Sequence, residues 1–301
     1  MALTSNTRKS ACGAGTHRIS DMTKLLLVDG HCLLFQMFYG MPARIIGKNG
    51  KAIQGTLGFV GAIRKMIAMT KPTHVAVIFD SETHNPRTDL DPNYKANRED
   101  YSETDEQDNP FSQLPDIYKA LDVMGIAHTE AIGCETDDVL AAYAKKYKTD
   151  THIIICSQDS DFFQLICDRV SVLRYRGDRS VVCDKEYIHS KLGIRPEQYA
   201  DFKSLIGDGS DHIKGIPGIG PKTAAALMGQ FGSLEALFAH PDQITKQRIF
   251  DSIMQNLDRL RLNRRLITLD DSAPLPFEMD ALVYRDCEMT TSEILSILGL
   301  R

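Results

Sequence analysis

The sequence predicts an α/β fold with a mostly parallel central sheet flanked by helices. Three apolar runs have the length and composition of buried strands: KLLLVDG (24–30), HVAVIFD (74–80) and HIIICSQDSD (152–161). Helical patterns such as GFVGAIRKMIAM and TDDVLAAYAKKY separate them, which is typical of parallel strands joined by crossover helices. At 301 residues the chain is long enough for one large domain and a smaller module.

The composition excludes several classes of protein. The seven cysteines lie far apart without a CxxC pair, which indicates reduced thiols rather than disulfides or a zinc site. No apolar run approaches the roughly 20 residues that a membrane span needs. We therefore expect a cytoplasmic protein without a membrane partner. The net charge of -5 by itself disfavours a nucleic-acid partner.

The first 21 residues, MALTSNTRKSACGAGTHRISD, lack hydrophobic periodicity and carry no acid before Asp21. Their composition also fits a transit peptide. We favour a disordered leader, or an extension ahead of a true start at Met22, and leave this stretch out of the fold.

Acidic residues stand where each apolar run ends. Asp29 and Asp80 close the first two runs, and the third ends with the pair Asp159 and Asp161. Ligands of such sheets bind outside the carboxyl ends of the strands. A single strand-end aspartate is usually a helix cap or a turn former, but three at one edge indicate a site. Ser160 between the pair would let alternate side chains of the strand point to one face.

Two further acidic clusters follow in the chain. GCETDDVLAAYAKKY starts a helix with three acids, more than capping alone needs, and IGDGSDHIKGIPGIG places two in a glycine-rich loop. The nine carboxylates that we expect to converge are Asp29, Asp80, Glu135, Asp137, Asp138, Asp159, Asp161, Asp208 and Asp211.

Nine carboxylates cannot all stay ionised together without cations. Because the set holds only oxygen ligands, it suits Mg²⁺, with Mn²⁺ as a substitute, rather than zinc. Mg²⁺ held by carboxylates is typical where the substrate supplies phosphate oxygens, and two ions about 4 Å apart support in-line hydrolysis of a phosphodiester. Without these nine acids the formal net charge of -5 becomes +4, so the remaining surface is compatible with a polyanion.

The segment GIPGIGPKTAAALMGQFGSLEALFA has the form of a helix-hairpin-helix. Its glycines allow a tight turn, and a helix that starts near Pro221 points its positive end outward. Such a hairpin grips the backbone of duplex DNA without reading bases. The alternative is a tight turn that binds nothing. The candidate DNA-binding residues are Gly215, Gly218, Gly220, Lys222 and Thr223.

From Lys24 to Asp271 the chain resembles the 5′-nuclease family. This family comprises the 5′→3′ exonuclease domain of bacterial DNA polymerase I, its stand-alone relatives, and the phage and eukaryotic flap endonucleases. The resemblance rests on LLLVDG, PTHVAVIFD, YKANR, ETDDVLA, SQDSDFFQL and GDGSDHIKGIPGIGPKTA, in the family's order. Nothing after them resembles a polymerase, so we expect a free-standing nuclease.

The resemblance implies a PIN/resolvase-like core and two groups of metal ligands. The first group would be Asp29, Asp80, Glu135, Asp137 and Asp138, and the second Asp159, Asp161, Asp208 and Asp211. Two or three Mg²⁺ ions are implied. In relatives the hairpin binds duplex DNA, often with a K⁺ ion.

The polar segment between residues 81 and 113 is too long for an ordinary loop. The family places a helical arch here, and Tyr94, Lys95 and Arg98 match its YKxxR motif. We expect Tyr94 to stack on a base, and Lys95 and Arg98 to neutralise charge on the scissile phosphate. Plain solvation is the alternative for the two cations. The arch's second half is acidic and should not line a DNA path.

Two positions depart from the family pattern. Gln36 stands where bacterial relatives commonly carry an arginine that approaches substrate phosphate, which weakens binding or shifts the work to Arg64 or Lys65. SQDSD stands where relatives often read TGDKD, so a lysine is missing. Both aspartates remain, and we expect an active enzyme.

We therefore predict a Mg²⁺-dependent 5′→3′ exonuclease or 5′-flap endonuclease. Its substrate would be duplex DNA with a 5′ single-stranded flap or end, with RNA–DNA hybrids as a further candidate, and it would act as a monomer. The alternatives are a non-catalytic helix-hairpin-helix protein, a haloacid-dehalogenase-like or Toprim-like Mg²⁺ enzyme, and a PIN-like RNase. The expected segments are a leader (1–21), a core (22–195) with an arch at about 83–112, a helix-hairpin-helix subdomain (196–265) and a C-terminal segment (266–301) that packs back on the core.

Overall fold

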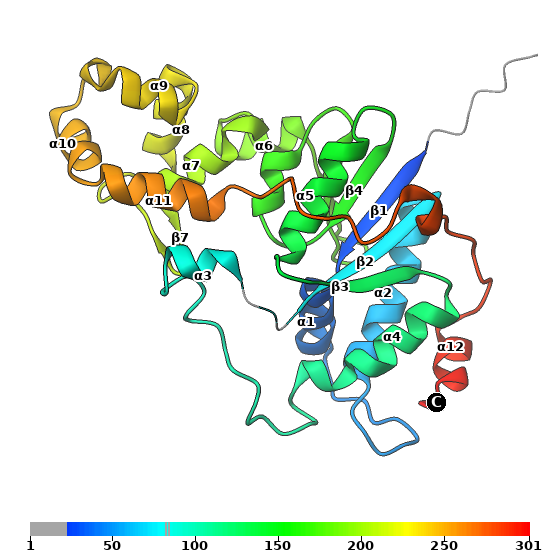
Figure 1. The fold of residues 1–301 in the computed structure, drawn as a ribbon. Coiled ribbons are helices and arrows are strands. Elements are labelled where there is room, and N and C mark those ends of the chain that lie inside the picture. Colours follow the sequence, from blue (N-terminus) through cyan, green and yellow to red (C-terminus); the bar gives the residue numbers. More distant parts are fainter. Residues whose placement is uncertain (1–22, 82, 84) are drawn as a thin grey trace, which may run out of the picture.

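The computed structural model describes residues 23–81, 83 and 85–301. The predicted leader therefore lies outside the described residues. A six-stranded sheet in the order β3-β2-β1-β4-β5-β6 forms the centre of the molecule (Figure 1). Its strands are β1 (Lys24–Asp29), β2 (His74–Asp80), β3 (Ala127–Ala131), β4 (His152–Cys156), β5 (Val170–Arg174) and β6 (Val181–Cys183). Strands β1 to β5 pair in parallel and β6 is antiparallel, which confirms the predicted mostly parallel sheet.

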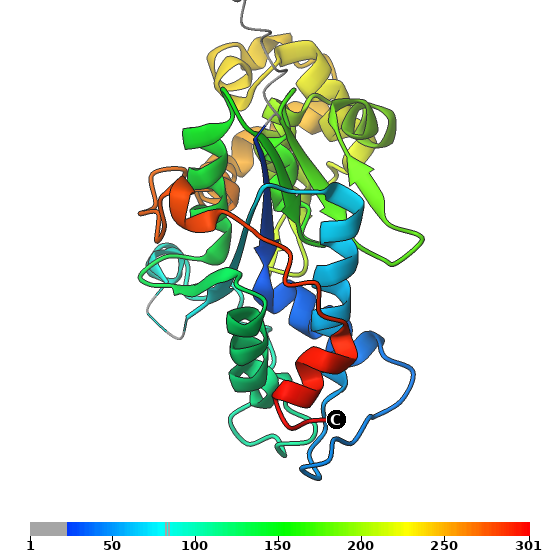
Figure 2. The same ribbon diagram turned by 90° about the vertical axis from the view of Figure 1, so that its right-hand side faces the viewer.

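Both faces of the sheet are covered, which explains why the strands are continuously apolar. On one face, Leu26 and Val28 of β1 pack with helices α1 (Gly30–Gly40), α2 (Gln54–Thr70) and α4 (Leu114–Val123). On the other face, Leu25 and Leu27 pack with α5 (Thr136–Tyr147) and α6 (Lys185–Leu192). Figure 2 shows α2 (light blue) and α5 (green) on opposite sides of β1 (dark blue).

A helical module follows the sheet along the chain. It contains η3 (Pro196–Gln198), α7 (Tyr199–Ile206), α8 (Pro221–Phe231), α9 (Leu234–Ala239), η4 (Pro241–Gln243), α10 (Gln247–Gln255) and α11 (Leu257–Ile267), with a two-stranded hairpin of β7 (Gly207–Asp208) and β8 (Ile213–Lys214). The predicted helix start near Pro221 is confirmed. Phe202 and Leu205 of α7 share one hydrophobic core with Phe162 beneath the sheet, so the module is joined to the sheet by continuous packing.

The C-terminal segment runs back across the sheet (Figure 1). After η5 (Met279–Leu282), the backbone N–H of Tyr284 donates to the carbonyl of Thr73 at 2.9 Å. The last helix, α12 (Thr291–Ile297), packs against α2 and α4, and Ile294 is fully buried there. The segment thus covers the α2–α4 side of the core.

The segment that we expected to form a helical arch is helical only near its two ends. Among its described residues, α3 (Pro86–Leu90) and the 3-10 helix η1 (Pro110–Gln113) flank a stretch of turns. Aspartate side chains accept from the backbone two residues on, as in Asp91 to Asn93 and Asp100 to Ser102, both at 2.9 Å. Such turns compete with helical hydrogen bonds and explain the lack of longer helices.

No helix within the described ranges 23–81, 83 and 85–301 is long and apolar enough to span a lipid bilayer.

Candidate metal centre

Strand β1 lies between β2 and β4. The order of the strands therefore runs in opposite directions on the two sides of β1. Such a switch point opens a crevice at the carboxyl ends of the strands. Asp29 is the last residue of β1, Asp80 is the last residue of β2, and Asp159 and Asp161 follow β4. The three parallel strands therefore deliver these four carboxylates to one edge.

The pair after β4 is not part of the strand. β4 ends at Cys156, and Asp161 begins the 3-10 helix η2 (Asp161–Leu165). Oδ1 of Asp159 accepts a hydrogen bond from the backbone N–H of Asp161 at 2.8 Å. The expectation that alternate side chains of a strand point to one face is therefore wrong here. A turn, rather than the strand pleat, fixes the two carboxylates.

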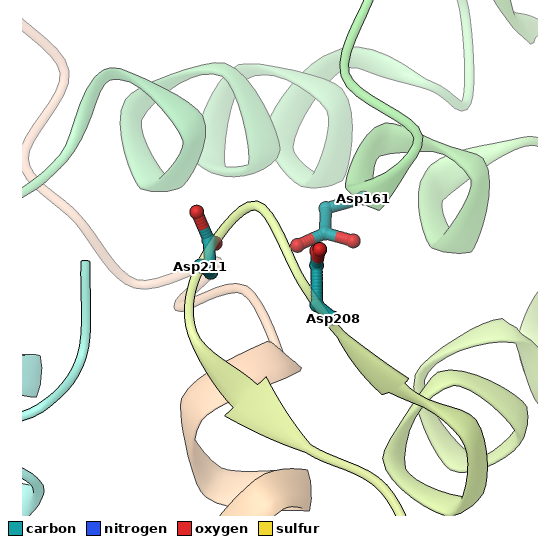
Figure 3. A group of neighbouring side chains, drawn as sticks. All are labelled: Asp161, Asp208 and Asp211. Atoms are coloured by element: carbon teal, nitrogen blue, oxygen red, sulfur yellow. The ribbon is translucent and has the colours of Figure 1, made fainter. Parts of the chain in front are cut away.

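One acidic group brings Asp161 together with the hairpin between α7 and α8. Carboxylate oxygens of Asp161, Asp208 and Asp211 all lie within 4.8 Å of one another. Figure 3 shows Asp161 and Asp208 close together, while Asp211 comes from the loop between β7 and β8. Nζ of Lys203, from α7, lies 2.5 Å from Oδ2 of Asp208 and also forms an ion pair with Asp161. The side chain of Lys203 is only 7% exposed.

Several carboxylates at this edge of the sheet have raised pKa values. Burial, with a further contribution from Asp159, raises the pKa of Asp161 to about 7 despite Lys203. Burial and the charge of Asp80 raise the pKa of Asp29 to about 7. Burial, followed by Asp159, raises the pKa of Asp137 well above its usual range. Buried like charges of this kind favour protonation or a bound cation.

The side chains of Asp29 and Asp80 also accept hydrogen bonds from backbone N–H groups at the starts of helices. Oδ1 of Asp29 accepts from the backbone N–H of Cys32 at 3.0 Å and caps α1. Oδ1 of Asp80 accepts from the backbone N–H of Thr136 at 3.0 Å. Burial alone would raise the pKa of Asp80, but His31 and that backbone N–H lower it below the ordinary range. The alternative that these aspartates are helix caps therefore explains some of their hydrogen bonds. It does not explain why so many carboxylates lie close together.

A buried arginine forms ion pairs with two of the predicted metal ligands, Glu135 and Asp138. Nη1 of Arg87, on α3, lies 2.5 Å from Glu135, and its two Nη atoms lie 2.7 and 2.6 Å from the two oxygens of Asp138. Asp138 also accepts from the backbone N–H of Asp270 at 2.8 Å. Both oxygens of Asp138 are therefore engaged, and so are both oxygens of Glu135, which Arg87 shares with Tyr94 and Lys95. The ligand roles of Glu135 and Asp138 stay predictions.

The YKxxR residues lie beside the same edge of the sheet, but the expectation for Tyr94 is wrong. Tyr94 is 6% exposed and packs with Ile213, Leu266 and Ile267. A buried ring cannot stack on a base, so that expectation is wrong. Its hydroxyl lies 3.2 Å from Glu135 instead.

The two cations of the motif contact carboxylates. Lys95 forms a buried ion pair with Glu135, and its backbone N–H donates to the carbonyl of Asp211 at 3.1 Å. Arg98 is half exposed, with Nη2 3.6 Å from Oδ1 of Asp211. Plain solvation therefore does not describe Lys95.

The backbone geometry of the hairpin favours glycine at two positions. A Cβ on Gly215 would lie 2.2 Å from the carbonyl oxygen of Ile206, and Gly218 has a φ of +78°. Gly220 precedes α8, whose first turn has no side-chain cap among the described residues. Free N–H groups at a helix start attract anions. Lys222 is exposed and Thr223 half-buried in this first turn.

Sequence reasoning missed Arg87, Lys203 and His31. Arg87 lies in the polar segment 81–113 and Lys203 in a helical pattern, and basic residues in both settings are usually solvated, so neither cation carried a signal. His31 adjoins the strand end at Asp29, and its Nδ1 accepts from the backbone N–H of Asp80 at 3.0 Å. Gln36, at the departure noted above, donates to the carbonyl of Tyr175 at 2.6 Å.

The chain is similar to known 5′-3′ exonucleases in both parts. Residues 24–193 match the family of the 5′-3′ exonuclease N-terminal resolvase-like domain, and residues 194–290 match the 5′-3′ exonuclease C-terminal SAM fold. The thermostable DNA polymerase I of Thermus thermophilus is 34% identical over 257 residues, which cover 85% of this chain and 30% of that protein. The DNA polymerase I of Rhizobium leguminosarum is 33% identical over 274 residues, 88% of this chain and 26% of that one.

The chain thus spans less than a third of the length of these curated relatives. A solved structure of the bacteriophage T5 flap endonuclease, in a pseudo-enzyme–product complex with DNA and metal ions, shares the fold with a TM-score of 0.67. It is 22% identical and covers 91% of this chain and 98% of that one.

Proposed function

Because the chain belongs to the 5′-3′ exonuclease family, we propose that it is a Mg²⁺-dependent nuclease that hydrolyses DNA phosphodiesters at or near 5′ ends. The observation that carries the proposal is the convergence of Asp161, Asp208 and Asp211 within 4.8 Å of one another, beside the strand-end acids Asp29 and Asp80. Among the described residues, Lys203 is the one buried cation that pairs with Asp161 and Asp208, and bringing several carboxylates together in a largely buried place is costly for a protein that has no cation to bind there.

The residues present fit divalent magnesium. The donors are carboxylate oxygens, which Mg²⁺ and Mn²⁺ prefer, and burial together with neighbouring carboxylates raises the pKa values of Asp29 and Asp161, an effect that a bound cation would offset. When bound, two such ions would stabilise the attacking and leaving oxygens of an in-line displacement. We assign Asp29, Asp80, Glu135, Asp137 and Asp138 to one ion, and Asp159, Asp161, Asp208 and Asp211 to another. A third ion is compatible with this donor count.

The basic residues beside the carboxylates would bind the scissile phosphate. Lys95 and Arg98 now contact Glu135 and Asp211. Once cations neutralise those acids, both side chains are available for the non-bridging oxygens of a phosphate, where fixed positive charge stabilises the transition state. Lys95 is held in place for this by its backbone hydrogen bond to Asp211.

The hairpin would bind the duplex. Gly215 and Gly218 hold the turn, and the uncapped start of α8 with Lys222 offers N–H groups and a charge to backbone phosphates. The phage T5 relative of the same fold was solved with DNA, which supports this placement. The proposal includes a K⁺ ion on hairpin carbonyls, activity on 5′ flaps and RNA–DNA hybrids, and action as a monomer in the cytoplasm.

A panel of 5′-labelled flap, nicked, blunt and RNA–DNA substrates, each with Mg²⁺, Mn²⁺ or EDTA, tests the proposal. Wild-type protein should cut near 5′ ends only with a divalent ion. The double variant Asp159→Ala/Asp161→Ala should bind the same DNA without cutting it.

Asp168→Ala is the matched control, because Asp168 is a surface carboxylate in the same segment, 88% exposed. It should cut as the wild type does. If the wild-type protein binds every substrate and cuts none, the non-catalytic helix-hairpin-helix alternative is correct.

A further inference from the structure

The turn between β5 and β6, at residues 175–180, brings positive charge to the carboxylate edge of the sheet. β5 runs parallel to β4, so this β5–β6 turn lies at the same edge as the acids that follow β4. β6 then returns antiparallel. Positions 174 to 179 carry three arginines and one aspartate, a local excess of positive charge in a chain whose net charge is -5.

The backbone of the β5–β6 turn is held by its own hydrogen bonds. Oγ of Ser180 accepts from the backbone N–H of Arg176 at 2.9 Å and donates to the carbonyl of Gly177 at 2.6 Å. The backbone N–H of Arg179 donates to the carbonyl of Arg176 at 3.2 Å. Gly177 has a φ of +60°, which glycine adopts without strain. The turn therefore fixes where the exposed side chains of Arg176 and Arg179 begin.

Two glutamines fasten the β5–β6 turn beside the metal centre. The carbonyl of Tyr175 accepts from Nε2 of Gln36, on α1, at 2.6 Å and from Nε2 of Gln158 at 3.0 Å. Gln158 directly precedes Asp159, and Arg176 directly follows Tyr175. Only Tyr175 and Gln158 therefore separate Arg176 from a proposed metal ligand along this path.

Arg174 supports the turn from the last position of β5. Its Nη2 donates to the carbonyl of Gln158 at 3.1 Å, and its Cζ lies 4.7 Å from the centroid of the Phe163 ring. Arg174 is half-buried, whereas Arg176 and Arg179 are exposed. Arg174 thus has a structural role, and the two other arginines can contact a ligand.

The exposed arginines suit backbone phosphates. Neither Arg176 nor Arg179 forms an ion pair with any residue that the structure describes, and Asp178 between them offsets only one of the two charges. Guanidinium groups bind phosphate oxygens through two parallel N–H bonds. Exposed arginines are usually only solvated, but here their place decides. Phosphates of one DNA strand follow each other about every 3.4 Å along the axis, so DNA held at the carboxylates brings further phosphates to the turn.

The β5–β6 turn is separate from the arch segment. The arch segment follows β2, and β2 and β5 lie on opposite sides of β1. Tyr175, the one aromatic residue between positions 174 and 180, is buried. The turn therefore offers charge to the phosphates of a duplex rather than a ring to an unpaired base.

We propose that Arg176 and Arg179 bind backbone phosphates of the DNA duplex beside the metal centre, on the β5 side of the site. The inference rests on the proposed function, because DNA at the carboxylates is what brings phosphates to this turn. It adds a contact distinct from the YKxxR cations and from the hairpin before α8. The uncharged Gln36 holds the turn in place and leaves the phosphates to the two arginines.

The test follows binding of a labelled blunt duplex by fluorescence anisotropy, in EDTA so that no bond is cut, at salt concentrations between about 50 and 200 mM. Arg176→Gln/Arg179→Gln should weaken binding about tenfold at the higher salt concentration. It should also reduce the slope of log Kd against log salt by about 2, because each lost phosphate contact removes about 1.

Lys71→Gln/Lys148→Gln is the matched control. Both lysines are exposed, and they follow α2 and α5 directly before β2 and β4, at the opposite end of the sheet. This variant loses the same formal charge far from the carboxylates and should keep the wild-type slope. Melting temperatures establish that each variant is folded.

A rescue tests the place of the contact. Nε2 of Gln36 lies 2.6 Å from the carbonyl of Tyr175, directly before Arg176, so an arginine at position 36 should reach the same phosphates. Gln36→Arg, added to the double arginine variant, should restore about half of the lost slope. The absence of this recovery in a folded triple variant would overturn the placement beside α1.

Cleavage in Mg²⁺ gives an independent readout. The double arginine variant should raise KM about tenfold and change kcat by less than about twofold, because it loses binding that is equal in the ground state and the transition state. A disturbed metal centre would lower kcat instead, and that result would contradict a role limited to phosphate binding.

Equal slopes for the double arginine variant and the lysine control would overturn the inference. So would a reduced slope in Arg64→Gln/Lys65→Gln that the arginine variant does not show, because α2 would then carry the contact. Cleavage of 5′ ends by the wild type, with an unchanged slope in the arginine variant, contradicts the turn contact alone. A reduced slope in that variant, with no cleavage by the wild type in Mg²⁺, contradicts the proposed nuclease activity alone.

Discussion

Nζ of Lys203 lies 2.5 Å from Oδ2 of Asp208, and the same ammonium group is paired with Asp161. Burial alone would lower the pKa of Lys203, but Asp161 and its neighbours raise it well above the ordinary value. The lysine therefore stays charged inside the acidic group. It is the internal counter-charge of the second carboxylate set when no metal is bound.

Replacing Lys203 with methionine keeps most of the side-chain volume and removes the charge. Removing one partner of a buried ion pair costs about 3–5 kcal/mol, so Lys203→Met should lower the unfolding free energy by that amount in EDTA. In Mg²⁺ the loss should be smaller, because the ion supplies the missing charge. Urea denaturation with and without Mg²⁺ measures both values.

Lys185→Met is the control for this variant. Lys185 pairs with Asp168 on the surface and should change stability little in either condition. An equal loss for Lys203→Met in EDTA and in Mg²⁺ would show that Lys203 and the metal do not share one site.

Arg87 should be essential for the base of the arch. It joins α3 to Glu135 and Asp138, and its Nε donates to the carbonyl of Leu266 at 3.0 Å. Arg87→Met leaves Asp138 without an ion-pair partner and Glu135 with Lys95 alone, and it should cost about 3–5 kcal/mol in urea denaturation. Arg87→Lys should recover only part of this, because lysine cannot form the two-pronged contact with Asp138. Stability of Arg87→Met equal to the wild type would contradict the role assigned to Arg87.

The stability of the metal-free protein should fall between about pH 4 and 7. Asp29 and Asp161 have folded pKa values of about 7, against an ordinary 3.8, so in this range the folded state holds protons that the unfolded chain has released. Rising pH therefore favours unfolding. The lowered pKa of Asp80 acts in the opposite sense, and only below about pH 4.

Melting temperatures in EDTA at pH 5 and pH 8 measure this effect. The value should be lower at pH 8, and Mg²⁺ at pH 8 should restore it. Asp161→Asn removes one of the titrating groups and should reduce the difference. A melting temperature that rises from pH 5 to pH 8 in EDTA would rule out the crowded-carboxylate explanation.

Gly215 should not tolerate a side chain. An added Cβ would meet the backbone of Ile206 at the end of α7, so Gly215→Ala should cost about 1–3 kcal/mol and weaken duplex binding. Gly229→Ala, inside α8 with nothing within 4 Å of the added atom, should instead stabilise by about 0.5–1 kcal/mol. Thermal melting and a duplex-binding titration compare the two, and similar effects of both would contradict the packing argument.

The sequence predicts the sheet well because burial on both faces leaves a local pattern. Runs such as Leu25–Val28 are apolar throughout, and the aspartate that follows marks the strand end. The sequence predicts the correct sheet edge for Asp159 and Asp161 but the wrong local structure. The sequence does not mark where the strand ends and the following turn begins, because the polar residues follow the apolar run directly.

The rest depends on contacts between distant segments. Tyr94 is buried only because the arch base packs on Ile213 and Leu266, more than a hundred residues away. Lys203 is buried only because α7 lies against η2. A helical pattern carries no sign of such contacts, since a lysine on a helix is normally solvated.

The central claim is that the converged carboxylates hold the metal ions at which 5′ ends are cut. Titration of Mn²⁺ followed by electron paramagnetic resonance counts the bound ions directly in the wild type and in Asp161→Ala/Asp208→Ala. The wild type should bind at least two ions. The double variant should bind one fewer, and its cleavage of a 5′-flap substrate should fall more than about 100-fold. An unchanged count of bound ions in the double variant would contradict the claim.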